Sequence, residues 1–470
     1  MRKIISVFLI ATIMVACKTE KATTTNSDEK TIVPFSEKVM ETAVIYEANI
    51  RQYSKEGTFD KFTQDIPQLK ELGVKIIWLM PIFPISETKR KATGGADSKF
   101  ASDFPKEEQS KYLGSYYAVS DFTKINPEFG TIKDFRKLIK TAHENDMYVV
   151  LDWVPNHTGW DHTWLKKNPE FYTQNEKGEV IHPKDTDWTD VADLNYNNKE
   201  LRNAMVKDMQ YWLTEEGVDG FRCDVAGSVP TDFWQEAIPK LRAKKDIFML
   251  AEAWEPELLA DGLFDMAYGW DRHHTMNHMA KGNSAAKVWR ENYVKDTTRY
   301  ASDDVLMTFV TNHDENSWNG TIKERLGDSW EAMTALSYLA PGMPLIYSGQ
   351  EFGLNHRLKF FEKDSIPHAK GDEWNVLKKL AKLKKSNAAL NGGKNAASYK
   401  MLETGNENIV AFKRIKNNNE VIFIANFSKK DEQTSIVFEG RFIDFMSNTE
   451  LEKKTIKTLK SNEYKILIKK

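Results

Sequence analysis

From Ala43 onward, short apolar runs alternate with stretches whose apolar residues recur every three or four positions. Phe62, Ile66 and Leu69, for example, have the spacing of one buried helix face. Repeated strand–helix units over this length predict an α/β fold, a (β/α)8 TIM barrel over residues 41–390. A doubly wound open sheet is the alternative, but we find no Gly-rich phosphate loop to support it. The eight predicted strands lie at residues 44–46, 74–80, 148–153, 220–225, 247–252, 264–268, 305–310 and 344–348.

From about Ser398 the pattern changes to short alternating strands with turns between them and no helices. This pattern predicts a C-terminal antiparallel β-sandwich domain over residues 391–470. We expect this C-terminal domain to support the barrel structurally; glycan binding is the alternative role. Within the barrel, two long stretches without clear periodicity, 89–109 and 158–196, follow the second and third strands. Long loops in a compact domain are usually functional.

The first residues have the pattern of an export signal. Arg2 and Lys3 precede an apolar run that ends at Ala16, and residues 1–16 are too short to span a bilayer as a mature helix. Residues 14–17, Met-Val-Ala-Cys, resemble a bacterial lipobox, so we expect Cys17 to carry lipid; an ordinary signal peptide is the alternative. Residues 17–40 should form a flexible tether. The protein is therefore expected on a bacterial membrane, on the periplasmic or cell-surface side.

Overall charge and cysteine content narrow the possible partners. Lys and Arg number 66 and Asp and Glu 68, for a net charge of -2, and no block of like charge stands out. Nothing therefore favours a nucleic-acid partner. The 2 cysteines, Cys17 and Cys223, have separate explanations, so we expect no disulfide. We expect a monomer without an organic cofactor.

Four of the predicted strands end in polar residues. In a parallel barrel such residues converge on one face, where these enzymes carry out their chemistry. In residues 220–225 the side chains alternate, so Arg222 and Asp224 should share this face while Phe221, Cys223 and Val225 point the other way. The four segments are 149–157, 220–225, 248–252 and 307–314.

In order, these four segments resemble the four sequence signatures of the α-amylase family, glycoside hydrolase family 13. The resemblance runs from about Tyr46 to the segment 344–351. It implies a small inserted domain after the third strand, at about 158–196, and a β-domain at the C-terminus. It also implies a retaining hydrolase of α-1,4-glucosidic bonds in starch or maltodextrins.

The resemblance assigns a role to each acid. Asp224 corresponds to the nucleophile, Glu252 to the general acid/base and Asp314 to the carboxylate that grips the distorted sugar. Cleavage of a glycosidic bond needs a group that donates a proton to the leaving oxygen and a carboxylate that stabilises or traps the cationic sugar carbon. For one acid alone, a structural ion pair would be the better interpretation, but the whole set favours catalysis.

Other matching residues surround these acids. Arg222, also counted among the substrate-binding residues, should keep Asp224 ionised, because a guanidinium lowers a carboxylate pKa. Calcium is implied by the match of Asn156 and Asp193 to family ligands, although Ser228 stands where the family has a histidine, and Ca²⁺ takes six or more oxygens. The remaining roles are sugar stacking by Tyr117, hydrogen bonding to substrate by His157 and His313, and bracing of the arginine by Asp152.

Several alternatives stay open. Within the family, the enzyme could act on α-1,6 bonds, pullulan or short oligosaccharides as an α-glucosidase, or transfer glycosyl units to another sugar. Outside enzymes, it could be a glycan-binding lipoprotein on the same barrel. A pure binder has no need of the full carboxylate set, which favours the enzyme.

Overall fold

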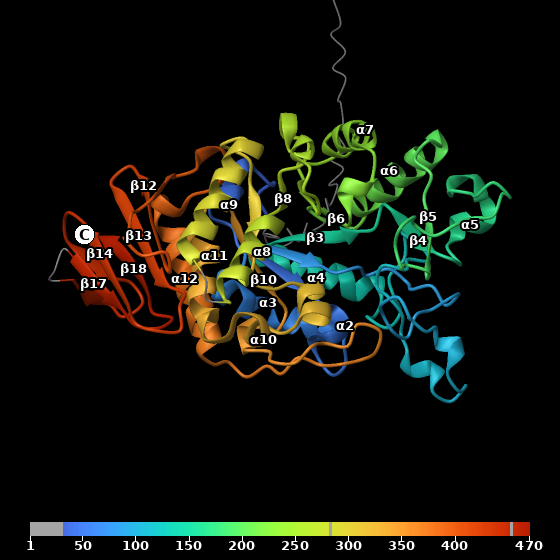
Figure 1. Ribbon diagram of the computed structural model, residues 1–470. Coiled ribbons are helices and arrows are strands. Elements are labelled where there is room, and N and C mark those ends of the chain that lie inside the picture. Colours follow the sequence, from blue (N-terminus) through green and yellow to red (C-terminus); the bar gives the residue numbers. More distant parts are fainter. Residues whose placement is uncertain (1–31, 282–283, 452–454) are drawn as a thin grey trace, which may run out of the picture.

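The computed structural model describes residues 32–281, 284–451 and 455–470. Its centre is a closed barrel of eight parallel strands in the order β1-β10-β9-β8-β7-β6-β3-β2 (Figure 1). Each strand matches one of the eight predicted apolar runs, so the barrel prediction is confirmed. The strands are β1 (Ile45–Ala48), β2 (Ile76–Leu79), β3 (Tyr148–Trp153), β6 (Gly220–Cys223), β7 (Phe248–Ala251), β8 (Met266–Tyr268), β9 (Leu306–Thr308) and β10 (Met343–Tyr347).

Helices surround the barrel, and their buried faces follow the predicted spacing. In α4, Phe135, Leu138 and Ile139 are buried, and Thr131 and Asp134 cap the first turn reciprocally. The helices are α1 (Glu37–Thr42), α2 (Ile50–Tyr53), α3 (Phe59–Leu72), α4 (Ile132–Glu144), α5 (Thr163–Lys167), α6 (Lys199–Thr214), α7 (Thr231–Arg242), α8 (Trp270–Met279), α9 (Ala285–Arg299), α10 (Ile322–Leu326), α11 (Trp330–Leu339) and α12 (Asp372–Ser386).

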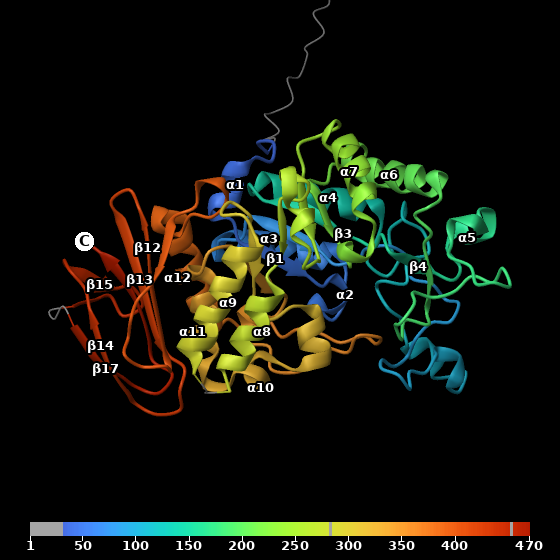
Figure 2. The same ribbon diagram turned by 45° about the horizontal axis from the view of Figure 1, so that its top comes forward.

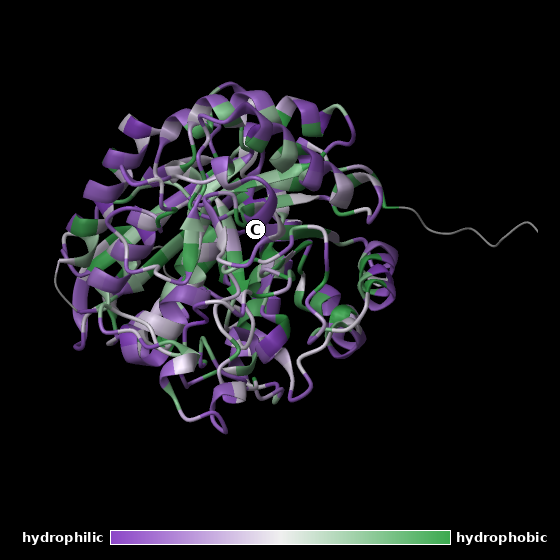
Figure 3. Ribbon diagram, turned by 90° about the vertical axis from the view of Figure 1, so that its right-hand side faces the viewer, coloured by the Kyte–Doolittle hydropathy of each residue, from purple (hydrophilic) through white to green (hydrophobic). Residues whose placement is uncertain are grey.

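The strands separate two apolar layers. Residues such as Ile76, Val150 and Leu250 fill the barrel interior. Their neighbours, such as Ile77 and Val149, pack outward against the helices. The hydropathy colouring shows apolar residues gathered on the central strands and hydrophilic residues on the outer helix faces (Figure 3). A strand buried on both faces leaves little room for charges except at its ends.

After β3, the chain forms a small outlying unit. Strands β4 (His157–Gly159) and β5 (Val191–Asp193) pair antiparallel, and α5 lies between them in sequence. In Figure 1 this unit projects from the side of the barrel opposite the C-terminal domain. The long loop after β2 lies next to it, and the two are tied together by Lys91, whose Nζ donates to the Asp187 carbonyl oxygen at 2.5 Å.

The C-terminal domain confirms the predicted antiparallel sandwich. A six-stranded sheet, β11-β12-β13-β18-β15-β16, faces a two-stranded sheet, β14-β17, across an apolar core. The opposite face of the large sheet packs on the barrel near α9 and α11 (Figure 2). Its strands are β11 (Ser398–Met401), β12 (Ile409–Lys416), β13 (Asn419–Asn426), β14 (Glu432–Val437), β15 (Phe442–Asp444), β16 (Thr449–Glu450), β17 (Thr455–Leu459) and β18 (Tyr464–Lys469).

The predicted tether, 17–40, is too long at its C-terminal end. Phe35 is buried, and its ring lies 5.4 Å from that of Tyr148 and 5.3 Å from that of Phe248, at the amino ends of β3 and β7. Met40, in α1, is buried beside it. The apolar side chains at 35 and 40 therefore seal the base of the barrel. The predicted signal peptide and lipobox lie outside the described residues.

Candidate active site

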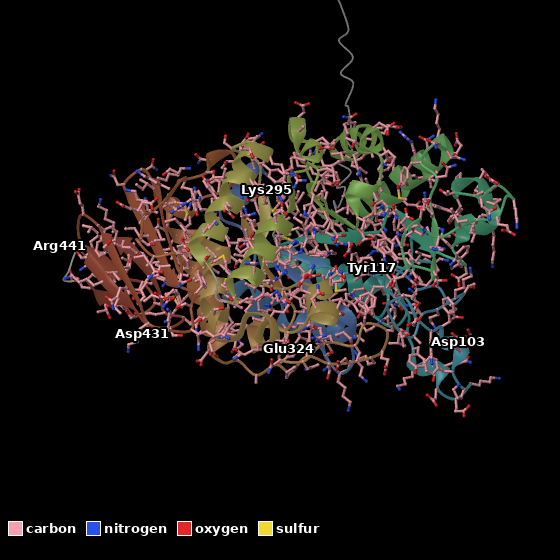
Figure 4. All side chains as sticks on the ribbon, in the orientation of Figure 1. Asp103, Tyr117, Lys295, Glu324, Asp431 and Arg441 are labelled. Carbon is pink, nitrogen blue, oxygen red and sulfur yellow. The ribbon has the colours of Figure 1, made fainter. Side chains whose placement is uncertain are left out.

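A cavity of about 440 Å³ opens at the carboxyl ends of the barrel strands. The chain brings most of the predicted site residues together there, although they come from distant segments. Figure 4 places Tyr117 nearer the centre of the molecule than Asp103, which lies toward the lower right edge in the loop after β2. The predicted residues that line the cavity are Tyr117, His157, Asp224, Glu252, His313 and Asp314.

Arg222 was predicted to bind substrate, but it lies beneath the cavity floor, outside the lining, and joins three acids. It is fully buried on β6, and its Nη1 donates to Asp152 Oδ1 at 2.8 Å and to Asp224 Oδ1 at 2.9 Å. Its Nη2 lies 2.8 Å from Glu252 Oε2. The barrel register explains this arrangement, because Arg222 sits beside Asp152 on β3 in the sheet. One guanidinium thus fixes the positions of both proposed catalytic carboxyl groups.

The residue after Asp224 departs from the predicted alternation. The strand ends at Cys223, and Val225 has φ 38°, a left-handed conformation that is rare and strained for a β-branched residue. Val225 therefore lines the cavity instead of pointing toward the helices with Phe221 and Cys223. Its amide donates to Glu252 Oε2 at 2.8 Å, so the strained turn directly positions this acid.

His313 connects the floor of the cavity to Glu47, a residue of β1 that sequence reasoning missed. His313 Nδ1 lies 2.5 Å from Glu47 Oε1, and its Nε2 lies 2.8 Å from the Tyr117 hydroxyl. The Tyr117 hydroxyl also donates to Asp152 Oδ2 at 3.1 Å. Tyr116, by contrast, donates to Asn49 and lies under Arg51. Of the two tyrosines, the structure therefore turns Tyr117 toward the cavity.

The charges at this site are strongly coupled. Five carboxyl groups share two cations, Arg222 and His313. Burial raises the pKa of Asp152, Asp224 and Glu252, and Arg222 opposes that rise. Burial alone would lower the pKa of His313, but the Asp314 and Glu47 carboxylates outweigh it and raise this pKa to about 9. The imidazole is therefore protonated at neutral pH, and an excess of acids favours a proton on one of them. The five acids are Glu47, Asp152, Asp224, Glu252 and Asp314.

The predicted calcium ligands lie beside His157, outside the cavity lining. Asn156 precedes β4, and Asp193 pairs across the sheet with His157. Asn156 Nδ2 contacts His157 Nδ1 at 3.2 Å, and burial lowers the pKa of His157 to about 3, so this ring is neutral. Over the three described ranges, no group of three or more His, Cys, Asp or Glu side chains could hold a metal ion. Two candidate oxygens fall short of a calcium shell, and the site stays a prediction.

Sequence reasoning also missed much of the cavity wall. Its aromatic and charged members come from loops without periodicity, where only the length of the loops gave a signal. Glu47 follows an apolar run, and no second acid or histidine close to it in the sequence marks it as part of the site. The missed lining residues are Lys91, Gly94, Gly95, Ser115, Asp187, Trp188, Asp190, Val191, Val225, Trp318, Phe360 and Phe361.

A parallel barrel with a cluster of acids at its carboxyl end has the architecture of a (β/α)8-barrel enzyme. Residues 22–400 match the model of a known family, described as the alpha amylase catalytic domain. The chain belongs to the α-amylase family.

Individual relatives agree with this assignment. The chain is 25% identical over 405 residues to "Alpha-amylase MalA" of Haloarcula japonica, covering 83% of this chain and 56% of the relative. It is 28% identical over 341 residues to a 4-alpha-glucanotransferase of Thermotoga neapolitana, covering 63% of this chain and 68% of the relative. Among solved structures, an alpha-amylase from Lactobacillus plantarum superposes with a TM-score of 0.78 at 28% identity, covering 91% of this chain and 98% of that one. The chain thus spans little more than half of the first relative.

Proposed function

We propose that the protein is a retaining glycoside hydrolase that cleaves α-1,4-glucosidic bonds in starch or maltodextrin-type glucans. The observation that carries this proposal is the Arg222 guanidinium, which holds Asp224 and Glu252 together at the cavity floor, within 2.8 to 2.9 Å of its nitrogens. Retention needs carboxyl groups about 5 to 5.5 Å apart, whereas inversion needs roughly 6.5 to 9.5 Å for a water between them. Attachment to one guanidinium favours the shorter separation.

In the proposed reaction, Asp224 attacks the anomeric carbon while Glu252 donates its proton to the leaving oxygen. The first step breaks the glycosidic bond and forms a glycosyl ester on Asp224. Glu252, now ionised, takes a proton from water, which attacks the same carbon and releases Asp224. Asp314 and the His313 imidazolium line the cavity where they can bind sugar hydroxyls. The raised pKa of Glu252, caused mainly by burial, keeps its proton in place before the first step.

Glycosyl transfer is the second candidate, because one of the relatives is named a 4-alpha-glucanotransferase. In transfer, a sugar hydroxyl replaces water in the second step, and the residues used are the same. Release of reducing ends from starch, pullulan and maltooligosaccharides tests the proposal. Disproportionation of maltotriose into longer chains without a rise in reducing ends would favour transfer instead. No activity on any of these glucans would contradict both.

We also propose that the protein is exported and anchored to a bacterial membrane through lipid on Cys17. The support is the signal-like segment 1–16 and the lipobox-like residues before Cys17. Residues 32–40 join the barrel at its amino end, because the Tyr148 hydroxyl donates to the Val33 carbonyl and Phe35 packs beside it. An anchored enzyme would then direct its cavity away from the membrane. Loss of membrane fractionation on Cys17→Ser tests the anchor; a variant that stays membrane-bound would refute it.

Calcium is a further proposal, which the family resemblance of Asn156 and Asp193 supports. No step of the reaction depends on it. Titration calorimetry with CaCl₂ on the wild type and on Asp193→Ala tests it directly: heat that the substitution abolishes would support the site, and absence of binding to the wild type would reject it.

A further inference from the structure

One side of the cavity is closed by an aromatic wall, which we define as Gly94, Trp318, Phe360 and Phe361. The Trp318 ring lies 5.0 Å from that of Phe360 and 6.0 Å from that of Phe361. Its indole rests so closely on Gly94 that a Cβ atom there would lie 2.7 Å from Trp318 Cζ3. Three segments far apart in sequence therefore meet at this wall.

Hydrogen bonds between neighbouring loops, one backbone to backbone and one backbone to side chain, hold the aromatic wall in place. The amide of Leu113 donates to the Phe361 carbonyl at 2.6 Å, which ties the loop after β2 to the segment that carries both phenylalanines. The π-helix Glu315–Asn319, which carries Trp318, is tied to the same segment because the Leu358 amide donates to Asn316 Oδ1 at 2.9 Å.

A buried arginine supports the aromatic wall from below. Arg51, with 1% of its surface exposed, donates through Nη1 to the carbonyl oxygens of Gly114 and Phe360 at 3.0 and 3.4 Å. The neighbouring Gln52 donates to the carbonyls of Lys359 and Glu362 at 2.6 and 2.8 Å. A wall anchored in this way is a fixed part of the site.

The aromatic wall continues the groups that would hold the glycone, the sugar portion that is transferred to Asp224. Tyr117 is stacked on Phe360 with an interplanar angle of 11°, and Trp318 lies on the π-helix directly after Asp314. Glu252 protonates the leaving oxygen, so the leaving chain departs on its side. There Val225 lines the cavity next to Glu252, to which its amide donates, and the loop after β7 presents Trp254 with 41% of its surface exposed. The wall therefore limits how far the chain can extend beyond the glycone, and it leaves the leaving-group side free.

The cavity size agrees with this orientation. At about 440 Å³, it lies at the small end of the range in which proteins enclose small ligands. Lys91 extends the barrier toward the inserted unit: it is 4% exposed, and its Nζ lies 3.7 Å from Asp190 Oδ1.

We propose that the aromatic wall restricts the enzyme to exo action, so that it removes short units from the non-reducing ends of α-glucans. This inference rests on the proposed function. A chain that continued past the glycone site would collide with Trp318 and Phe361, whereas a chain that ends there would fit. The preferred substrates are then maltooligosaccharides and the free ends of maltodextrins.

The test uses p-nitrophenyl maltoheptaoside with and without a 4,6-O-ethylidene block on the non-reducing end, with products followed by chromatography. We expect the open substrate to be cleaved and the blocked one to react at least roughly 100-fold more slowly, because collision with a fixed wall discriminates more strongly than a lost contact. Similar rates on both substrates would overturn exo action and leave the hydrolase proposal intact. Cleavage of neither would overturn both.

Two variants connect the result to the wall. Trp318→Ala should raise the ratio of blocked to open cleavage by at least tenfold, because it removes the largest ring of the barrier, whereas the matched Trp318→Phe keeps a ring against Gly94 and should leave the ratio low. Trp318 is 44% exposed, so neither change should unfold the protein, which thermal unfolding checks. An unchanged ratio in Trp318→Ala would contradict a barrier at this residue.

Discussion

At their amino ends the barrel strands meet Phe35 and Met40, which close an apolar base, while at their carboxyl ends they present Arg222 and the acids around it. The base contains close ring contacts, such as that of Phe35 with Phe248. The carboxyl end instead contains a left-handed valine, a π-helix and the Glu47 Oε2 atom, which is buried and has no hydrogen-bond partner. The same strands thus carry stabilising apolar packing at one end and, at the other, catalytic groups that lower the stability of the fold. This separation is usual in such barrels. Substitutions at the two ends should have opposite effects on activity and stability.

The largest effect on activity is expected from Glu252→Gln and Asp224→Asn. The first removes the proton donor and should lower kcat by about 10²- to 10⁴-fold; the second removes the attacking carboxylate, and its effect should be at least as large. Initial rates on maltooligosaccharides measure both. Asp265→Asn is the control at the amino end, where Asp265 accepts from the Met249 amide at 2.8 Å, and it should retain kcat. Loss of cooperative unfolding in Glu252→Gln or Asp224→Asn would indicate a structural role instead.

Glu47→Gln should lower kcat by a smaller factor and should change the pH dependence of kcat/KM. The pKa of His313 is about 9 because Asp314 and Glu47 outweigh burial. Its charge pairs are therefore complete below the ordinary histidine pKa of about 6.5 and are lost as the pH rises through about 9. Without Glu47, the alkaline limb of kcat/KM should move to lower pH, and kcat should fall roughly 10- to 100-fold through misplacement of His313 and Tyr117.

A matched control for Glu47 exists on the helix-facing side of the barrel. Glu351 is equally buried but accepts from the Tyr46 hydroxyl at 2.6 Å, away from the cavity. Glu351→Gln should leave the alkaline limb in place. An identical pH profile for the wild type and Glu47→Gln would show that Glu47 does not set the charge of His313.

The smallest effect on activity, combined with the largest on stability, is expected from Phe35→Ala at the amino end. Removal of this buried ring should lower the free energy of unfolding by about 3 kcal/mol, with kcat unchanged at temperatures where the protein is folded. Val33, with 74% of its surface exposed, provides the control, since Val33→Ala should change stability by less than about 0.5 kcal/mol. Denaturant unfolding measures both. A fall in kcat for Phe35→Ala under native conditions would show that the two ends are coupled.

The two ends also differ in how far the sequence predicts them. Barrel strands were predictable because a strand buried on both faces is a continuous apolar run, and the acids were recognisable because they interrupt or end such runs. Val225 was predicted to face the helices, since alternation assumes that the strand continues, yet the backbone turns at this residue. Glu47 resembled any polar residue near a strand. Its role depends on His313, which is 266 positions away.

The aromatic wall shows a second limit. Trp318 and Phe360 belong to segments with no periodic pattern, and their meeting depends on hydrogen bonds between loops. At the N-terminus, composition predicted a tether up to residue 40 because the segment is polar overall. Its few apolar residues, such as Phe35, find their partners only in the folded barrel.

The central claim is that Asp224 is the nucleophile of a double displacement. Two inversions at the anomeric carbon must return the starting configuration, so the first product of maltooligosaccharide hydrolysis should be the α-anomer. Proton NMR during the first minutes, before mutarotation, measures this directly. Early accumulation of the α-anomer is the predicted result; early accumulation of the β-anomer would show a single displacement and remove Asp224 from that role.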